Sequence, residues 1–312
     1  MRICCFNVEN LFLSPLETDQ KGEVHQKIFQ PGDSSLKKLK DLALVLLDID
    51  ADIFALVEVG PEDMLREFTK SLLGDRYRVS VIEGNSDRGI HIGYLIKNDC
   101  SFKIEHLTHR GRPLSLSTQQ NPVYLSRDIA ELRLIKKEKK RPSLILLLVH
   151  LKSKRSDLSS DFGGKKKRQS EFQLLLETYQ TLRDRYHGKV PILLLGDFNG
   201  VMIADRREPE FEKLKEYPEL KDLLERLEYS EEERITQISF DNKQNRLAEQ
   251  FDYILVPDLL EQAIVKEKSG LYLYKSEDGH PKVLPKSSYE RSLLPSDHYP
   301  LVLELKLPSD NT

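Results

Sequence analysis

The sequence contains no tryptophan, only three cysteines and no long hydrophobic run. Because no apolar stretch is long enough to cross a bilayer, we expect no membrane insertion. The chain begins at Met1 without the apolar segment and cleavage site of a secretory signal, which predicts a cytoplasmic protein. Cys4 and Cys5 are adjacent and Cys100 is isolated, so they match neither a metal-site spacing nor a disulfide framework.

The sequence also lacks a strong excess of either charge. It has 48 Lys and Arg against 51 Asp and Glu, a net charge of -3. This balance excludes a protein that is basic over its whole surface, such as one that coats DNA. It still allows a local basic groove, because phosphate contacts need only a few Lys or Arg. The 32% charged and 39% hydrophobic residues are typical of a globular protein.

Apolar runs typical of buried strands alternate with helical patterns along the chain. Strands are expected at 2–7, 53–57, 78–82, 90–97, 129–135, 143–151, 190–195, 251–256 and 301–305. Helices are expected at 36–47, with Ser34 or Ser35 as the cap, at 62–73, at 169–186 and, as a charged surface helix, at 208–233.

These elements predict an α/β fold. Hairpin-like pairs such as 78–82 with 90–97 indicate mixed sheets, and so many buried strands fit two sheets packed face to face. We therefore expect a four-layer α/β/β/α sandwich with helices outside. No repeat, linker or change of composition divides the chain, which predicts a single domain over residues 1–312.

The apolar run 190–195 ends in Gly196-Asp197-Phe198-Asn199-Gly200. Asp197 and Asn199 are two residues apart, so they would point the same way from an extended backbone. The glycines let the backbone turn and let a ligand approach closely. A buried carboxylate is costly unless it has a function, which makes this turn a candidate site. The alternative is an Asx-type turn that closes the strand.

Polar residues also lie at the ends of the other buried strands. They are Asn7, Glu9 and Asn10, then Glu58, His150 and Asp252, and finally Asp297 with His298. Each also has a purely structural alternative. Asn7 and Asn10 could form turns, Glu58 could cap the next helix, and His150 could be a core histidine. Asp252 could pair with Arg246, and Asp297 with His298 could belong to a loop. Their repeated position favours convergence on one sheet edge, where such side chains suit a hard divalent cation and acid–base groups.

The chain resembles the endonuclease/exonuclease/phosphatase superfamily through an ordered set of segments. They are Asn7-Val8-Glu9-Asn10-Leu11-Phe12, Glu58, His150-Leu151-Lys152-Ser153, Gly196-Asp197-Phe198-Asn199, Asp252-Tyr253-Ile254-Leu255 and Ser296-Asp297-His298. Each segment is short, but their joint order and spacing are specific, and the resemblance spans residues 2–303. It implies a metal-dependent hydrolase of phosphate esters.

The resemblance implies Mg²⁺ as the cofactor, with Mn²⁺ or Ca²⁺ as alternatives. Glu58 matches the family's principal metal ligand, while Glu9 and Asp297 match positions that bind the metal directly or through water. Asn7 would lie beside the metal and donate a hydrogen bond to the phosphate. The metal is needed because the charge of the phosphate repels a nucleophile until it is neutralised.

The same resemblance implies the catalytic groups. Asp197 matches the residue that orients or deprotonates the attacking water, and Asn199 would contact a phosphate oxygen. His298 would donate a hydrogen bond to a non-bridging oxygen or act as an acid, oriented by Asp252. His150 matches the other histidine of the DNase-like and phosphatase members, and it argues against the abasic-site subgroup.

Basic residues suggest how a phosphate could be bound. Arg127 lies where many bacterial members have an arginine that reaches the substrate phosphate; the alternative is a surface ion pair with Asp128. The cluster 136–141 is expected to form a hairpin tip. The segment 152–168 has seven Lys and Arg that could bind a polyanionic strand or a phosphorylated head group. Its alternative is a flexible charged loop without a specific ligand.

The leading interpretation is a phosphodiesterase, a nuclease-like enzyme that acts on nucleic acid. The alternative is a phosphomonoesterase for a small soluble ester such as an inositol phosphate or a nucleotide. Members that act on inositol lipids carry a Trp-Cys-Asp-Arg type of sequence, where this chain has Phe251-Asp252-Tyr253. A non-catalytic binding module is disfavoured because no catalytic position is missing. The sequence does not indicate an oligomeric state.

Overall fold

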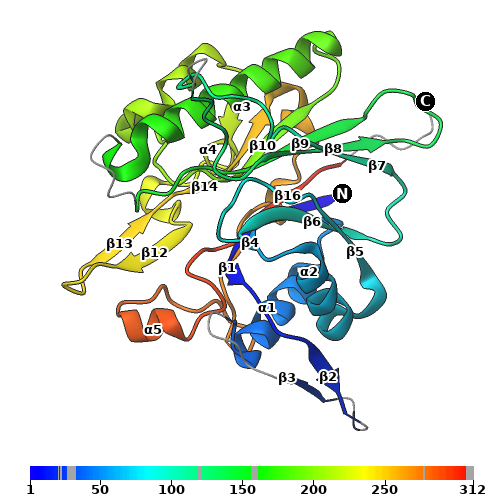
Figure 1. Ribbon diagram of the computed structural model, residues 1–312, viewed down its shortest axis with the longest axis vertical. Helices are drawn as coiled ribbons and strands as arrows, with labels where there is room; N and C mark the ends of the chain where they lie inside the picture. The colour runs from blue at the N-terminus through cyan, green and yellow to red at the C-terminus, as the bar shows by residue number, and fades with distance from the viewer. Residues whose placement is uncertain are drawn as a thin grey trace.

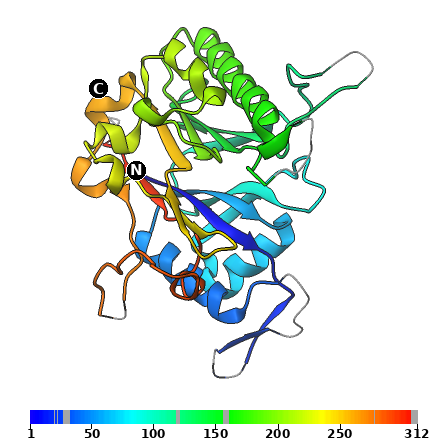
Figure 2. The same cartoon turned by 90° about the vertical axis from the view of Figure 1, so that its left-hand side faces the viewer.

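The structure is a computed structural model that describes residues 1–19, 21, 23–26, 33–117, 121–155, 161–276 and 278–306. Two six-stranded sheets lie face to face, and the main helices cover their outer faces (Figure 1). Helices α1 and α2 lie on one side of the pair and α3 on the other, which the perpendicular view also shows (Figure 2). The predicted α/β sandwich is therefore confirmed.

The first sheet has the strand order β15-β16-β1-β4-β6-β5. Its strands are β1 (Arg2–Leu11), β4 (Ile53–Val59), β5 (Tyr77–Val81), β6 (His91–Lys97), β15 (Gly270–Leu271) and β16 (Leu301–Glu304). Strand β1 is parallel to β4 and antiparallel to β16. The predicted hairpin between β5 and β6 is present as an antiparallel pair, so the sheet is mixed.

The second sheet has the order β11-β14-β10-β9-β8-β7. Its strands are β7 (Lys103–Thr108), β8 (Ile129–Ile135), β9 (Leu144–His150), β10 (Ile192–Asp197), β11 (Leu220–Asp222) and β14 (Asp252–Pro257). Strand β10 is parallel to β9 and antiparallel to β14. Two separate hairpins are formed by β2 (Leu16–Thr18) with β3 (Val24–Gln26) and by β12 (Gln237–Phe240) with β13 (Arg246–Glu249).

Five helices are present in the described ranges, and the first three follow the expected amphipathic patterns. They are α1 (Leu36–Ile49), α2 (Glu62–Phe68), α3 (Lys165–Arg185), α4 (Leu223–Arg226) and α5 (Ser288–Ser292), and a π-helical turn extends α2 over Thr69–Leu73. Short 3₁₀ turns cover Gly74–Arg76, Phe162–Gly164, Ala204–Arg206, Pro209–Glu216, Glu231–Glu233, Asp258–Ala263 and Lys266–Lys268. Ser35 caps α1 by accepting a hydrogen bond from the Lys38 amide. None of the helices in the described ranges has the length and apolar character that a membrane-spanning helix needs.

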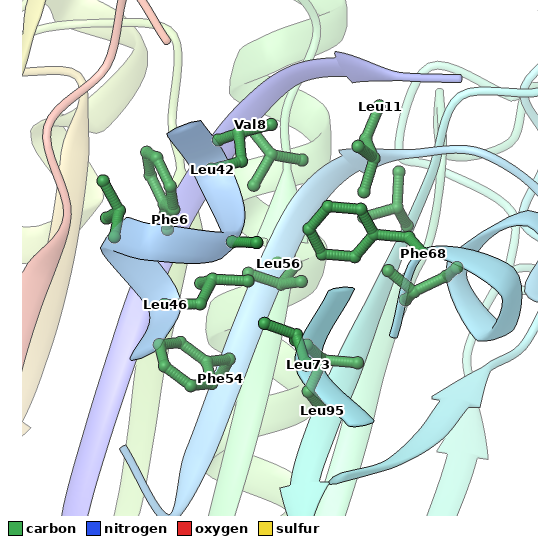
Figure 3. Close-up of a cluster of buried hydrophobic side chains, with 14 of the residues drawn as sticks. Phe6, Val8, Leu11, Leu42, Leu46, Phe54, Leu56, Phe68, Leu73 and Leu95 are labelled. Carbon is green, nitrogen blue, oxygen red and sulfur yellow. The ribbon is translucent and has the colours of Figure 1, made fainter. Parts of the chain in front are cut away.

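The apolar side chains alternate between two cores because successive residues of a strand point to opposite faces. On β1, Cys4 and Phe6 pack against the helices, while Ile3 and Cys5 face the second sheet. Figure 3 shows the helix-side core, in which Phe6 lies near residues of α1 and β4. The core between the sheets continues as far as the strand ends, where the polar residues begin.

The predicted helix over 208–233 is wrong. That segment contains a 3₁₀ turn, strand β11, the single turn α4 and a second 3₁₀ turn. Pro218 explains the break, because a proline disfavours helical backbone at the residue before it. The segment is not purely a surface element either, since Phe211, Leu223 and Leu224 are fully buried.

Candidate active site

Polar side chains continue the inter-sheet face of four strands beyond the apolar core. They are Asn7 of β1, His150 of β9, Asp197 of β10 and Asp252 of β14. On β10, for example, Leu193 and Leu195 face the inter-sheet core four and two residues before Asp197. The convergence predicted from the sequence is therefore present, but it lies at an edge shared by both sheets rather than on one sheet.

Two strands deviate from regular pairing where they enter this edge. The register of β4 shifts between Val57 and Val59, and Glu58 between them has a φ of 63°. Strict alternation would point Glu58 to the helix side, and a bulge of this kind redirects a side chain. Its Oε2 accepts a hydrogen bond from the Asn10 amide at 3.1 Å. Glu9 also has a positive φ, 52°, and such backbone strain concentrates at functional sites.

The turn after β10 is an Asx-type turn, and its Asp197 also belongs to the polar cluster. The Asn199 amide donates to Asp197 Oδ1 at 2.8 Å, so an Asx-type turn is formed. The glycines serve packing within the protein rather than the approach of a ligand. A Cβ on Gly196 would lie 1.9 Å from the Val149 carbonyl oxygen of β9, and one on Gly200 would lie 2.5 Å from the Phe211 ring.

Asp197 lies at the centre of the polar cluster. Asn7 Nδ2 donates to its Oδ2 at 3.0 Å. The Nε2 atoms of His150 and His298 are 3.7 and 3.9 Å from the same oxygen. Burial raises the pKa of Asp197 to about 7, although the positive charge of His298 opposes the shift. A carboxyl with such a pKa can accept or release a proton near neutral pH.

His298 and Asp252 form a buried pair. His298 Nδ1 is 2.7 Å from Asp252 Oδ2, and it must be the donor because a carboxylate only accepts. Burial disfavours the imidazolium, but the charges of Asp252 and Asp297 outweigh it and raise the pKa of His298 well above its usual value. Asp252 therefore binds His298 and not Arg246, which was the alternative partner.

The environment of His150 is the opposite. Burial, followed by the charge of Arg127, lowers the pKa of His150 well below its usual value, so the ring is neutral. Its Nδ1 is buried without a hydrogen-bond partner in the described part of the chain. Its Nε2 lies 3.7 Å from both Glu58 Oε1 and Asp197 Oδ2.

Glu58, His150 and Asp197 fit a divalent cation. One potential ligand atom from each lies within 4.8 Å of the others. Two ligand atoms on one ion, each about 2.1 Å from it, are about 3 to 4 Å apart, which agrees with the two 3.7 Å distances. Asp197, Asp252 and His298 form a second such group, but the short bond between His298 and Asp252 already engages that pair.

The other two expected metal ligands lie apart from this set. Glu9 Oε1 contacts the guanidinium of Arg291, and Lys38 Nζ is 3.1 Å from Glu9 Oε2. Asp297 Oδ2 is 3.3 Å from the same Arg291 nitrogen. Sequence reasoning missed Arg291, which lies on the short exposed helix α5 and belongs to no apolar pattern.

The cluster opens into a cavity of about 850 Å³. Glu9, Glu58, Asp197 and Asp297 line its acidic part, and the lining cations are Arg88, Arg127, Lys152, Lys154, Arg155, Lys167 and Arg291. Phe251 and Leu247 add apolar surface, and Lys154 Nζ lies 4.7 Å from the centre of the Phe251 ring. The cavity thus places carboxylates next to several cations, which suits a metal ion together with phosphate groups.

Arg127 belongs to the cavity and not to the surface. It is only 6% exposed, and the described residues show no ion pair between it and Asp128. Asp128 Oδ1 instead accepts hydrogen bonds from the amides of His109 and Ile129. The alternative of a surface ion pair is therefore wrong.

Glu171 of α3 connects the two loops that carry the cavity cations. Its Oε1 accepts from the Ser126 amide and its Oε2 from the Lys152 amide, both at 2.6 Å. The side chain is buried, and Glu171 lies beside Phe172 and four residues before Leu175, two core residues of the same helix. A carboxylate within the apolar stripe of a helix was the sequence signal for this residue.

The basic segment 152–168 divides into two parts, and its residues 156–160 lie outside the described ranges. Lys152, Lys154, Arg155 and Lys167 line the cavity. Arg168 is fully buried, pairs with Glu210 and donates to the Lys152 carbonyl at 2.9 Å. Arg168 therefore holds the loop in place and is not available to a substrate. The other basic cluster, 136–141, joins β8 to β9 as the expected hairpin tip.

Solved structures share the architecture. A Bacteroides thetaiotaomicron endonuclease/exonuclease/phosphatase family protein has 17% identity and a TM-score of 0.58, with 99% of this chain and 98% of that chain covered. A mannosyl-6-phosphatase of the same organism has 16% identity and a TM-score of 0.58, with 98% of this chain and 100% of that chain covered. D. rerio TDP2 complexed with a single-strand DNA product has 16% identity and a TM-score of 0.59, with 98% of this chain and 99% of that chain covered.

No protein-family model and no curated protein matches the sequence. The structural likeness extends over nearly the whole chain in each of these cases. The chain therefore has the fold of the endonuclease/exonuclease/phosphatase proteins, as the ordered motifs implied.

Proposed function

We propose that the chain is a divalent-metal-dependent phosphodiesterase that acts on nucleic acid. The observation that carries this proposal is the 850 Å³ cavity, in which the set of Glu58, His150 and Asp197 adjoins a wall of Lys and Arg. Carboxylates suit a hard cation, and several separate cations suit a substrate with more than one phosphate. A TDP2 of the same fold has been seen with a DNA product, which supports the substrate class.

The metal would be Mg²⁺ or Mn²⁺, held by Glu58 with His150 and Asp197. When bound there, the ion would neutralise charge on the phosphate and so lower the barrier to attack. His150 is kept neutral by burial, so its Nε2 is free to face the ion or the phosphate. Glu58 is held toward the cavity by the bulge in β4 and by its hydrogen bond from the Asn10 amide.

Asp197 would orient the attacking water and take its proton. Its buried carboxylate lies next to the proposed ion, where it can contact the attacking water and accept its proton. The hydrogen bonds from Asn7 and from the Asn199 amide fix the direction of the carboxylate. Asn199 also lines the cavity, where its side chain can contact a phosphate oxygen.

His298 would stabilise negative charge on the phosphate. Its Nε2 lies 3.9 Å from Asp197 Oδ2, the oxygen that His150 Nε2 also approaches. Asp252 keeps the ring positive and orients its Nε2 toward Asp197 and the cavity. Arg127 would bind a phosphate oxygen, since its buried guanidinium lines the cavity.

A phosphomonoesterase for a small phosphate ester is the second candidate. The mannosyl-6-phosphatase of the same fold favours it, because a nearly equal TM-score accompanies a small phosphate ester in that protein's name. Both candidates use the same metal and the same residues. They differ in whether the cleaved phosphate carries one ester or two.

A substrate panel separates the two candidates. Duplex and single-stranded DNA, RNA, inositol phosphates, a sugar phosphate and bis-nitrophenyl phosphate are incubated with Mg²⁺, with Mn²⁺ and with EDTA. We expect polynucleotide cleavage that EDTA abolishes and that Glu58→Gln abolishes too. Glu62→Gln is the matched control, because Glu62 pairs with Arg66 on the surface of α2. Release of phosphate from monoesters with intact polynucleotides would establish the second candidate instead.

A further inference from the structure

Arg291 lies between two carboxylates of the site. Helix α5 carries it, and this helix lies beside the β12–β13 hairpin (Figures 1 and 2). One guanidinium nitrogen contacts Glu9 Oε1 and lies 3.3 Å from Asp297 Oδ2. The guanidinium thus bridges residues that are far apart in the sequence and that both line the cavity.

A second cation completes this arrangement. Lys38 of α1 places its Nζ 3.1 Å from Glu9 Oε2 and donates to the Glu9 carbonyl at 2.6 Å. Both oxygens of the Glu9 carboxylate are therefore engaged by cations. Asp297 Oδ2 also accepts a hydrogen bond from Gln237 Nε2 at 3.3 Å. Two fixed positive charges balance the two carboxylates.

Glu58 has a different environment. In the described ranges, no Lys or Arg nitrogen lies within 4.0 Å of its carboxylate, and its Oε1 lies 3.7 Å from His150 Nε2. Of the three carboxylates that were expected to bind metal, Glu58 is thus open to a cation, while Glu9 and Asp297 already contact Lys38 and Arg291. A divalent ion at Glu9 and Asp297 would have to displace a guanidinium, which cannot lose its charge by deprotonation.

We propose that Arg291 takes the place of a second metal ion, so that the chain binds one divalent cation, at Glu58, His150 and Asp197. This inference rests on the proposed metal-dependent function and goes beyond it, because it assigns a fixed cation to two expected metal ligands. Arg291 is a positioning residue in this scheme. It holds Asp297, and through it the adjacent His298, while it adds positive charge to the cavity wall.

The number of bound ions tests the proposal without any substrate. Equilibrium dialysis, calorimetry and electron paramagnetic resonance with Mn²⁺ are applied to the full chain and its variants. We expect one Mn²⁺ per wild-type chain. Arg291→Gln should bind a second and weaker Mn²⁺, because removal of the guanidinium exposes two carboxylates. Glu9→Gln added to Arg291→Gln should abolish this second site.

A matched control keeps the loss of charge constant. Arg88 lines the same cavity and makes no ion pair within the described part of the chain. Arg88→Gln also removes one positive charge, and it should still bind a single ion. A second ion in Arg88→Gln would assign the effect to the general potential of the cavity and overturn the specific role of Arg291.

Two ions in the wild-type chain, or one ion in folded Arg291→Gln, would also overturn the inference. If Arg291→Gln does not fold, single variants of the wild type decide. We then expect Glu9→Gln to leave the Mn²⁺ affinity within about twofold and Glu58→Gln to weaken it at least about tenfold. Equal losses in both would refute the role of Arg291. No loss in Glu58→Gln, or no binding at all, would refute the proposed metal site itself.

Discussion

The carboxylate of Asp197 is 2% exposed, whereas its proposed role as a base requires the charged form. Burial raises its pKa to about 7, and hydrogen bonds from Asn7 and Asn199 hold it in one direction. Keeping such a group buried costs folding free energy, because the charged form has lost its water. Stability and activity therefore make opposite demands at this residue.

Replacing Asp197 by Asn separates these demands. We expect hydrolysis to fall by about 10³-fold or more, since the general base is lost. The free energy of unfolding at pH 8 should stay equal or rise, because the amide removes a buried charge. Turnover of the best substrate and denaturant unfolding measure the two effects. Asp205→Asn, on an exposed 3₁₀ turn, serves as the control. Unchanged turnover of Asp197→Asn would refute the proposed role of Asp197 as the general base.

Glu171 does not line the cavity, but it binds the backbone of two loops that do. Its two oxygens accept from the amides of Ser126 and Lys152, next to Arg127 and within the basic loop. Glu171→Gln places an amide donor against one of these N–H groups, which costs about 1–3 kcal/mol locally. We expect KM to rise several-fold with a smaller change in kcat, because substrate-binding loops move while Asp197 does not.

A variant on the same helix controls for the change of charge. Glu177 lies on the exposed side of α3, where it accepts from Gln173 at 2.9 Å. Glu177→Gln should leave both KM and kcat close to the wild type. Steady-state kinetics on both variants give the comparison. An equal KM in Glu171→Gln and wild type would show that the two loops hold their positions without this carboxylate.

At the scale of elements, the close approach of β9 and β10 positions His150 beside Asp197. The two strands are parallel, and their register pairs Asp197 with His150 directly. Gly196 lies against the β9 backbone with a φ of 140°, and a Cβ there would be 1.9 Å from the Val149 carbonyl oxygen. The strands can keep this register only with a glycine at that position.

Gly196→Ala should therefore be strongly destabilising. We expect a loss of about 3–5 kcal/mol, since backbone of a central strand must move. Gly188→Ala is the matched control: it has a φ of 65° and nothing within 4 Å of the added Cβ, so it should cost only about 1 kcal/mol. Urea unfolding of both variants measures the difference. Similar losses in the two would show that β9 and β10 tolerate a wider separation.

Strand β11 carries a buried carboxylate, Asp222, that does not line the cavity. Asp222 at the end of β11 accepts from Gln250 Nε2 at 2.9 Å, and its Oδ1 has no hydrogen-bond partner in the described ranges. Burial raises the pKa of Asp222 to about 6. Since the unfolded value is about 3.9, the folded state favours the protonated form, and stability falls as the pH rises from about 4 to about 6.

Asp222→Asn should remove this pH dependence. Below about pH 4 the wild type and the variant should have similar stability, because the carboxyl is neutral in both folded and unfolded chains. At pH 8 the variant should be more stable by about 3 kcal/mol, since it has no buried charge. Denaturant unfolding across this pH range provides the measurement. A stability difference that does not grow with pH would contradict the proposed burial cost.

At the scale of the whole molecule, the apolar runs and the order of the motifs were enough to predict two packed sheets and most of the site. Asn7, His150, Asp197 and Asp252 follow from strand periodicity, because each continues the face of its strand that packs between the sheets. Strand periodicity alone could not direct Glu58 into the cavity. Its direction depends on a bulge, and the local sequence does not specify where the register shifts.

The sequence also could not predict contacts between segments that are far apart along the chain. Arg291 and Glu9 are 282 residues apart, and only the folded chain shows that a short helix brings them together. The segment 208–233 was predicted wrongly because its charge pattern resembles a surface helix, while Pro218 and the pairing of β11 with β14 decide its structure. Local patterns therefore predict elements well, whereas tertiary pairing decides which charges meet.

The cavity lies at an edge that both sheets share, so its geometry depends on their packing. This arrangement, with the predicted single domain, implies one cooperative unfolding transition in which activity and both sheets are lost together. Leu146 is fully buried in the inter-sheet core, and Leu146→Ala should cost about 2–5 kcal/mol. Leu44 on α1 is 64% exposed, and Leu44→Ala should cost less than about 0.5 kcal/mol.

Three probes of the same titration test this cooperativity. Far-ultraviolet circular dichroism reports secondary structure, and tyrosine fluorescence reports packing, since the chain has 12 tyrosines and no tryptophan. Residual hydrolase activity reports the cavity. The three urea curves should coincide and should shift together in Leu146→Ala, because each sheet stabilises the other through the shared core. Activity lost well before the dichroism signal, with a separate second transition, would show instead that the sheets unfold independently and that the site depends on only part of the chain.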